Sequence, residues 1–124
     1  VVLPDNGVSM FDYWKPLLTD VLIDSVKASG GLLVDLASSE MRRLFNWRKV
    51  AREVDVVRPE FYVSKGGRLK TIVIYAKMCR GAMTRYLLQN RIDNADKLKS
   101  FDFEGFSYSE VDSKPGFPAF VANL

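Results

Sequence analysis

Residues 61–91 read FYVSKGGRLKTIVIYAKMCRGAMTRYLLQNR, and this stretch decides the fold. Its first part carries Gly66-Gly67 between two apolar runs, a pair typical of the tight turn of a β-hairpin. We therefore predict two antiparallel strands, over residues 53–64 and 69–75. Pro59 predicts an edge position or a bulge in the first of them. From about Ala76 the apolar residues recur with a helical period, which predicts a helix over residues 76–91.

The segments on either side add further helices and strands. A helix is predicted before Gly30-Gly31, and Pro16 is expected in its first turn, where proline is tolerated. A buried strand over residues 32–36 follows, then a helix capped by Ser38 or Ser39 with Met41 facing inward, and a basic connection over residues 46–52. Two final strands, 105–110 and 117–122, surround a turn at residues 113–116. The pattern predicts a single α+β domain over residues 1–124, with a partly antiparallel sheet flanked by helices.

Composition narrows the class of protein. The chain has 124 residues, of which 48% are hydrophobic and 27% charged, which is typical of a soluble globular domain. No apolar run is long enough to span a membrane. The chain has no histidine and a single cysteine, Cys79, so neither a His-assisted nucleophile nor a usual metal site is expected, and no cofactor is predicted. A lone cysteine favours a reducing compartment, the cytoplasm.

Charge is unevenly distributed along the chain. Residues 41–91 hold thirteen Lys/Arg against three Asp/Glu, whereas the other residues hold five against twelve. Such segregation predicts either a basic face able to meet phosphates or two halves that neutralise one another across the fold.

The predicted 76–91 helix separates two kinds of residue. At 100° per residue, Ala76, Cys79, Ala82, Met83, Tyr86 and Leu87 fall on one side, which is suited to cover a sheet. The other side carries Lys77, Arg80, Gly81, Thr84 and Arg91, with Arg85 at its flank. Arginine grips phosphate oxygens in pairs, and a mid-helix glycine lets another backbone come close. These residues predict either a track for a phosphate backbone or an ordinary solvated helix face.

Several short motifs carry a resemblance. The run Tyr75-Ala76-Lys77, Arg80-Gly81, Met83, Arg85 and Asn90-Arg91 resembles the signature of the YaaA-type peroxide-stress proteins of bacteria. Three other segments are similar to that family in the same order, namely Phe11-Asp12-Tyr13-Trp14, Asp35-Leu36-Ala37-Ser38 with Glu40, and Phe101 followed by Glu104-Gly105-Phe106. The match corresponds to roughly the second half of a family member. The opening Val1-Val2-Leu3-Pro4 has no initiator Met, so a fragment is expected, forming the C-terminal half of a larger fold.

The resemblance implies a cytoplasmic protein that protects DNA during hydrogen peroxide stress and is associated with lowering free iron. It also implies a fold with a positively charged cleft and a helix-hairpin-helix element that binds duplex and branched DNA. No signature of that element is found here, so it is expected in the absent N-terminal half of the chain. That half is therefore an expected partner, and no membrane partner is expected.

Two functional hypotheses result. In the first, the helix cations bind the phosphates of double-stranded or branched DNA, helped by the basic segment that carries Arg42, Arg43, Arg48 and Lys49. In the second, an enzyme acts on a nucleotide-like or phosphorylated substrate, with carboxylates Asp35 and Glu40 at a strand end and the arginines as clamps. A capped helix start explains Glu40 equally well. Cys79 is expected in the core, and Trp47 either stacks on a base or stabilises a loop.

Overall fold

The computed structural model describes residues 10–92 and 94–123, which form two compact units. The first contains residues 10–33 and 37–56, and the second contains residues 34–36 and 57–123. Each unit has its own apolar core. The α+β class is confirmed, whereas the single domain over residues 1–124 stays a prediction. The opening residues 1–9 lie outside the described part of the chain.

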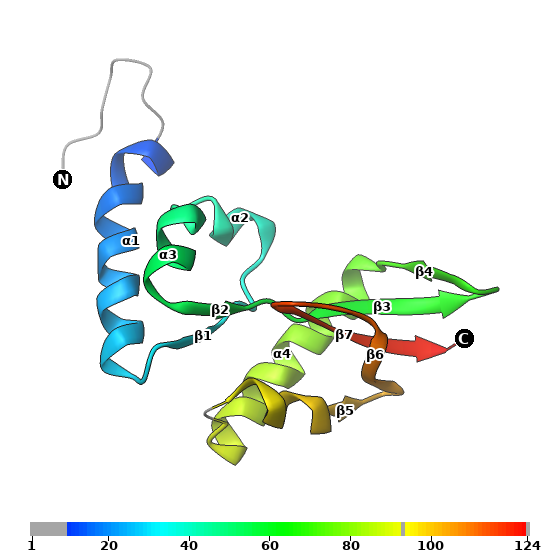
Figure 1. The fold of residues 1–124 in the computed structure, drawn as a ribbon. Helices are drawn as coiled ribbons and strands as arrows, with labels where there is room; N and C mark the ends of the chain where they lie inside the picture. The colour runs from blue at the N-terminus through cyan, green and yellow to red at the C-terminus, as the bar shows by residue number, and fades with distance from the viewer. Residues whose placement is uncertain (1–9, 93, 124) are drawn as a thin grey trace. The chain divides into compact units, whose positions relative to one another are not determined.

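The first unit is built from short helices around a small apolar core. These helices are α1 (Met10–Ala28), α2 (Ser39–Arg42) and α3 (Trp47–Glu53), and α1 and α3 pack side by side (Figure 1). The core holds Ile23 and Val26 from α1 against Val50 and Val54. Pro16 lies inside α1 rather than in its first turn, contrary to the sequence expectation; it is exposed, so its ring displaces no core side chain.

The segment expected as a basic connection is helical in the structure. The side chain of Asn46 caps α3 by accepting a hydrogen bond from the backbone N–H of Lys49 at 3.3 Å. Val50 and Val54, four residues apart, then fall on one face and reach the core. The cap of α2 by Ser38 is confirmed, since its hydroxyl accepts from the N–H of Met41. Met41 itself is exposed, contrary to the expectation that it faces inward.

The second unit contains a sheet that, within the described residues, has five strands in the order β4-β3-β7-β6-β5. The strands are β3 (Glu60–Lys65), β4 (Arg68–Lys70), β5 (Asp102–Phe103), β6 (Phe106–Lys114) and β7 (Phe117–Asn123). β3 and β7 are parallel, with Phe61 opposite Phe120, and the other neighbours are antiparallel. The first predicted strand is therefore central rather than at an edge. Pro59 lies just before it, following the short strand β2 (Asp55–Val57), so the proline interrupts no ladder. β1 (Leu32–Val34) pairs with β2.

The predicted hairpin is confirmed, but its second strand is shorter than expected. Gly66 and Gly67 both have positive φ, 61° and 78°, as a two-residue turn of this kind requires. β4 ends at Lys70 and α4 (Val73–Asn90) begins three residues later, so Ile74 and Tyr75 are helical rather than extended.

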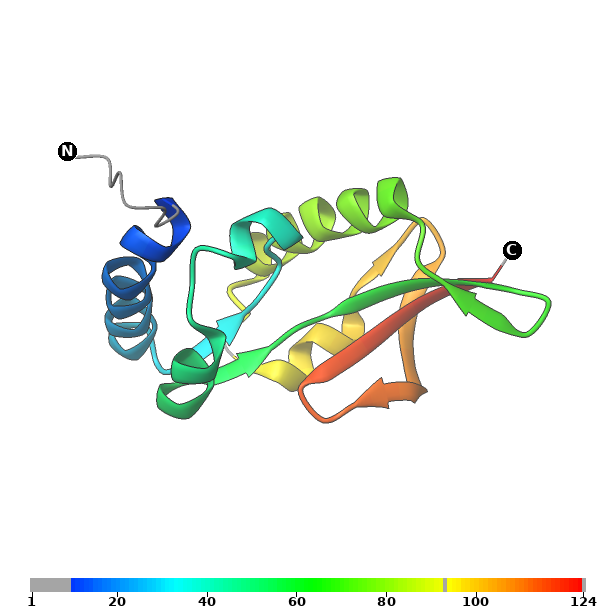
Figure 2. The same ribbon diagram turned by 90° about the horizontal axis from the view of Figure 1, so that it is seen from above.

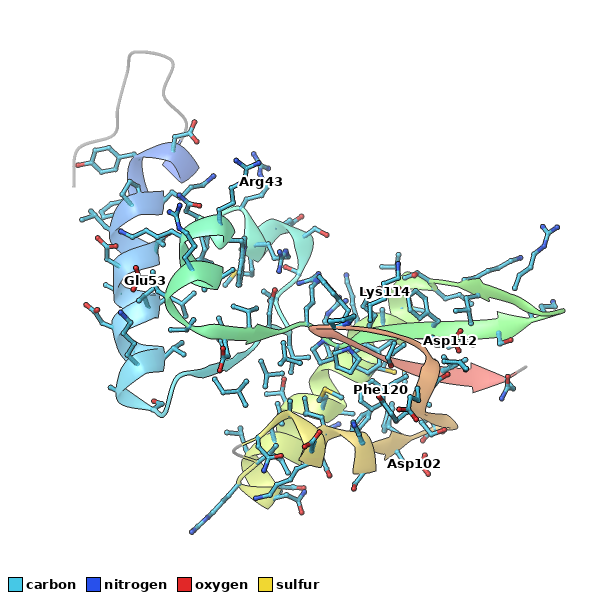
Figure 3. All side chains as sticks on the ribbon, viewed as in Figure 1. Arg43, Glu53, Asp102, Asp112, Lys114 and Phe120 are labelled. Atoms are coloured by element: carbon cyan, nitrogen blue, oxygen red, sulfur yellow. The ribbon has the colours of Figure 1, made fainter. Side chains whose placement is uncertain are left out.

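Helix α4 covers one face of the sheet (Figure 1, Figure 2). Its buried residues Cys79, Ala82 and Met83 join Phe61 and Phe120 in the core, which Leu98 of the 3₁₀ helix η1 (Ala95–Ser100) completes. Phe120, labelled in Figure 3, is fully buried on the strand next to β3. The inward side of the helix therefore matches the sequence prediction.

Candidate nucleic-acid interface

The outward side of α4 carries four cations. Lys77, Arg85 and Arg91 are exposed, and Arg80 is half-buried. Within residues 10–92 and 94–123, no carboxylate forms an ion pair with any of the four. A phosphate group that approached this side would therefore meet cations that form no ion pair with a described carboxylate.

Arg91 also ends the helix. It adopts the left-handed conformation, with φ 49° and ψ 51°, and its backbone N–H donates to the carbonyl of Leu87. This cap turns the chain away from the helix axis after Asn90. Arg91 therefore lies at the end of the track rather than along it.

Gly81 leaves an open space in the middle of α4. A Cβ atom at this position would meet no described heavy atom within 4 Å. No other part of the described chain therefore needs the glycine for close packing. Thr84, one turn further on, donates its hydroxyl hydrogen to the carbonyl of Arg80 at 2.8 Å. Its hydroxyl proton is thus engaged by the helix backbone, which leaves the Thr84 oxygen as an acceptor rather than a donor to phosphate.

The outward side of α4, with Lys77, Arg80 and Arg85, is called here the α4 ridge. Two hollows lie on opposite sides of it, as the helical angles of their lining residues indicate. Arg80 lines a cavity of about 260 Å³ together with Arg58, Glu60 and Thr71. Arg85 lines a second cavity of about 360 Å³, together with Tyr86, Gln89 and Asp102. Arg80 and Arg85 therefore each border a concave surface, one on either side of the helix.

Arg58, which lines the Arg80 cavity, also forms an ion pair that the sequence did not indicate. The Arg58 Nη1 lies 2.8 Å from the Oδ2 of Asp35, whose side chain is only 1% exposed. Burial lowers the pKa of the Arg58 guanidinium, and the carboxylate of Glu60 opposes that effect. Tyr62 donates its hydroxyl to Glu60. A buried aspartate needs a cationic partner, but nothing in the sequence indicates that the partner is 23 residues away.

The carboxylates of the enzyme hypothesis have different surroundings. Asp35 is held by Arg58, so its charge is already balanced inside the second unit. Glu40 is exposed in the first turn of α2, which belongs to the first unit. Its place matches the capped-helix explanation. Within residues 10–92 and 94–123, no three Asp, Glu or Cys side chains gather as ligands for a metal ion.

The basic segment of the first unit holds the other predicted cations. The guanidinium of Arg42 lies 4.3 Å from the ring centre of Trp47, whose Nε1–H donates to the Arg42 carbonyl at 2.8 Å. Trp47 therefore ties the start of α3 to the end of α2, which agrees with the stabilising role, the second of the two hypotheses. Lys49 forms an exposed ion pair with Asp20 at 2.8 Å, a contact of the kind that contributes little stability.

Two arginines of this segment are exposed. Arg48 lies on α3, and Arg43, labelled in Figure 3, lies just after α2. The other two cations of the segment make contacts within the unit. Lys49 pairs with the carboxylate of Asp20, and the guanidinium of Arg42 lies over the indole ring of Trp47.

Cys79 is fully buried in the core of the second unit. Burial raises the pKa of its thiol to about 11, because this effect is larger than the opposing effect of the nearby charge on Arg80. A thiol in this state reacts slowly with peroxide, since the thiolate is the reactive form. The structure confirms Cys79 as a core residue.

These features define an α+β protein in which a helix packs against a mixed sheet with one side and presents cations on the other. None of the described helices is long and apolar enough to cross a membrane. Residues 2–112 match the family described as peroxide stress protein YaaA. The chain belongs to this family.

Curated relatives support the assignment. A UPF0246 protein of Phocaeicola vulgatus is 56% identical over 109 residues, which cover 87% of this chain and 43% of the relative. A UPF0246 protein of Bacteroides fragilis is 55% identical over 111 residues, covering 89% of this chain and 43% of the relative. A UPF0246 protein of Hahella chejuensis is 39% identical over 105 residues, or 84% of this chain and 40% of that protein. The chain thus spans less than half the length of the relatives that it matches.

Proposed function

We propose that this chain supplies a DNA-binding surface to a cytoplasmic stress-response protein, which protects DNA during hydrogen peroxide exposure. The observation that carries the proposal is the outward side of α4, where Lys77, Arg80, Arg85 and Arg91 have no ion-pair partner among the described residues. Exposed cations in a row suit a polyanion whose charges repeat at short intervals along its length.

Binding is driven by charge and shape. The α4 side chains contact phosphates, with Arg80 and Arg85 gripping the backbone from the two sides of the ridge. The open surface at Gly81 lets the sugar-phosphate backbone approach the helix. The segment with Arg42, Arg43, Arg48 and Lys49 adds further phosphate contacts. Phosphate contacts position a protein without reading sequence, so affinity differs little between sequences of one shape.

The association with lower free iron is proposed for the longer protein. The described residues offer buried Cys79 and scattered carboxylates rather than a ligand cluster. For this chain we propose the DNA contact alone.

The test compares two double variants of equal charge. Arg80→Ala/Arg85→Ala removes two of the four α4 cations. Lys65→Ala/Arg68→Ala removes two exposed cations that flank the β3–β4 turn of the same unit. Binding to duplex and four-way-junction DNA is measured by fluorescence anisotropy over a range of salt concentrations. Each phosphate contact contributes about 0.9 to the slope of log K against log salt, so the α4 variant is expected to lower the slope by about 1.8.

The hairpin variant is expected to keep the wild-type slope. An unchanged slope in Arg80→Ala/Arg85→Ala contradicts the proposal. An equal loss in both variants also contradicts it, because that result indicates a general effect of net charge. Circular dichroism of each variant checks that the fold is retained.

A further inference from the structure

The Arg80 cavity, of about 260 Å³, lies along the first half of β3. β4 pairs with β3 only from Val63 onward, so no strand of the described sheet covers the edge of β3 before that residue. Arg58 and Glu60 line the cavity from this part of the chain, and Arg80 lines it from α4. Two guanidinium groups and one carboxylate therefore border a single hollow within the second unit.

Contacts within the unit hold Arg58 in place. Its backbone N–H donates to the carbonyl of Gly116 at 2.8 Å, and Pro59, the next residue, restricts its backbone conformation. Its Nη1 donates to the Oδ2 of Asp35 at 2.8 Å. A guanidinium has several N–H donors, so others remain for a ligand. A side chain that is already held loses little further conformational entropy when a ligand binds.

The other donors of the cavity suit a phosphate group. Arg80 forms no ion pair with a described carboxylate, and the hydroxyl of Thr71 also belongs to the lining. Guanidinium groups bind phosphate oxygens through paired N–H donors. The volume is below the range of about 300–1,000 Å³ that is usual for drug-sized ligands. The cavity therefore suits one phosphate with an attached sugar.

The carboxylate of Glu60 restricts what accompanies that phosphate. Tyr62 donates its hydroxyl hydrogen to this carboxylate, which helps to fix its orientation. An ionised carboxylate only accepts hydrogen bonds, so it attracts a ligand hydroxyl and repels a second phosphate. The charges of Arg58 and Arg80 are already opposed by those of Asp35 and Glu60. A phosphodiester with a single charge therefore suits the cavity better than a doubly charged phosphate monoester.

We propose that the Arg80 cavity binds a sugar phosphate with a free hydroxyl, in which Arg58 and Arg80 hold the phosphate and Glu60 accepts from the hydroxyl. In a DNA strand this combination occurs at the 3′ end, where one sugar carries both the last phosphodiester and a free hydroxyl. A free 5′-mononucleotide carries a phosphate and a hydroxyl on one sugar as well. For the strand end, the inference rests on the proposed function, because Arg80 belongs to both sites.

Three DNA molecules of one sequence separate a strand end from the rest of a duplex. The first is a duplex closed by a loop at each end, which has no strand terminus. The other two carry a one-nucleotide gap whose 3′ side ends either in a hydroxyl or in a phosphate, with a 5′-hydroxyl opposite in both. Binding of the 124-residue chain is measured by fluorescence anisotropy at a fixed salt concentration, with the dye in a loop.

The wild-type chain is expected to bind the 3′-hydroxyl gap about tenfold more tightly than the 3′-phosphate gap, since Glu60 repels the added charge. In Glu60→Gln this preference should be lost, because the amide carries no charge. Glu110→Gln makes the same change at an exposed position on β6 and should keep the preference. A preference that persists equally in both variants overturns the proposal.

Arg58→Lys tests the phosphate contact without removing the charge beside Asp35. Lysine lacks the planar fork of arginine, so affinity for the 3′-hydroxyl gap should fall several-fold while affinity for the closed duplex stays the same. An equal fall for both DNA molecules overturns the role given to Arg58. Circular dichroism checks the fold of each variant.

Thymidine 5′-monophosphate, titrated by calorimetry, tests the free nucleotide as the ligand. Binding that weakens in Arg58→Lys, with no preference between the two gaps, supports the cavity with a mononucleotide in it. Equal affinity for the two gaps and no binding of the nucleotide overturns the inference, whereas binding to the closed duplex then still supports the proposed function. Failure to bind the closed duplex contradicts the proposed function alone if the nucleotide binds.

Discussion

Replacement of Gly81 with alanine is expected to change the stability and the DNA affinity of the protein in opposite directions. Glycine in the middle of a helix costs about 1 kcal/mol relative to alanine, because it loses more backbone entropy on folding. The added methyl group at position 81 meets no heavy atom within 4 Å, so no steric penalty offsets the gain. The free energy of unfolding should therefore rise by about 0.5–1 kcal/mol. For a unit of this size, that corresponds to a rise in Tm of roughly 2–8 °C.

Urea unfolding followed by circular dichroism at 222 nm measures the first effect. Anisotropy with duplex DNA measures the second, for which we expect weaker binding because the methyl group occupies the space through which a phosphate backbone approaches α4. Ala82→Gly in the same helix serves as the opposite control, since it should lower stability at a buried position. A loss of stability in Gly81→Ala would refute the reasoning on packing. Unchanged DNA affinity in a stabilised variant would refute the role given to the open space.

Three other variants test separate parts of the second unit. Glu104 has φ 50°, a left-handed conformation that asparagine tolerates better than glutamate. Glu104→Asn should therefore raise the free energy of unfolding by up to about 1 kcal/mol in urea titrations. A decrease would contradict this prediction. Arg58→Ala leaves the carboxylate of Asp35 buried without its arginine and should lower the free energy of unfolding by about 2–3 kcal/mol in the same assay. The loss is smaller than for a fully buried pair because Arg58 is partly exposed. A loss below about 1 kcal/mol would contradict this prediction. The Cys79 pKa is raised from 9.0 to about 11, so the folded state holds this proton more tightly, and stability should fall as pH rises from 9 to 11. That fall should be smaller in Cys79→Ala, and equal falls in both proteins would contradict the assignment.

The sequence predicted those elements whose signals are local. Gly66 and Gly67 require positive φ, which few residues tolerate, so the hairpin turn was evident without any knowledge of its neighbours. The buried side of α4 followed from its helical period in the same way. The predicted start of α4 was wrong. Ile72, Ile74 and Tyr75 resemble a strand, and over so short a range the periodicity of apolar residues cannot distinguish a strand from a helix.

Other features depend on contacts that are distant in sequence. Helix α3 was missed although Asn46 and the spacing of Val50 and Val54 indicated it, since its basic residues suggested a connection. The cations on the outward side of α4 were predicted, but whether a described carboxylate pairs with them depends on where the fold places the acidic residues. The pair of Asp35 with Arg58 could not be predicted, because it forms only when the two segments fold together.

The parallel pairing of β3 with β7 has a consequence for synthesis on the ribosome. β7 lies between β3 and β6, so the sheet of the second unit has a gap at its centre until residues 117–123 have left the exit tunnel. Until then, Phe61 lacks Phe120, its partner across the two strands. The hairpin and α4 therefore wait for about thirty further residues before the strand that completes their core is available, and chaperones can bind the exposed apolar surface in that interval.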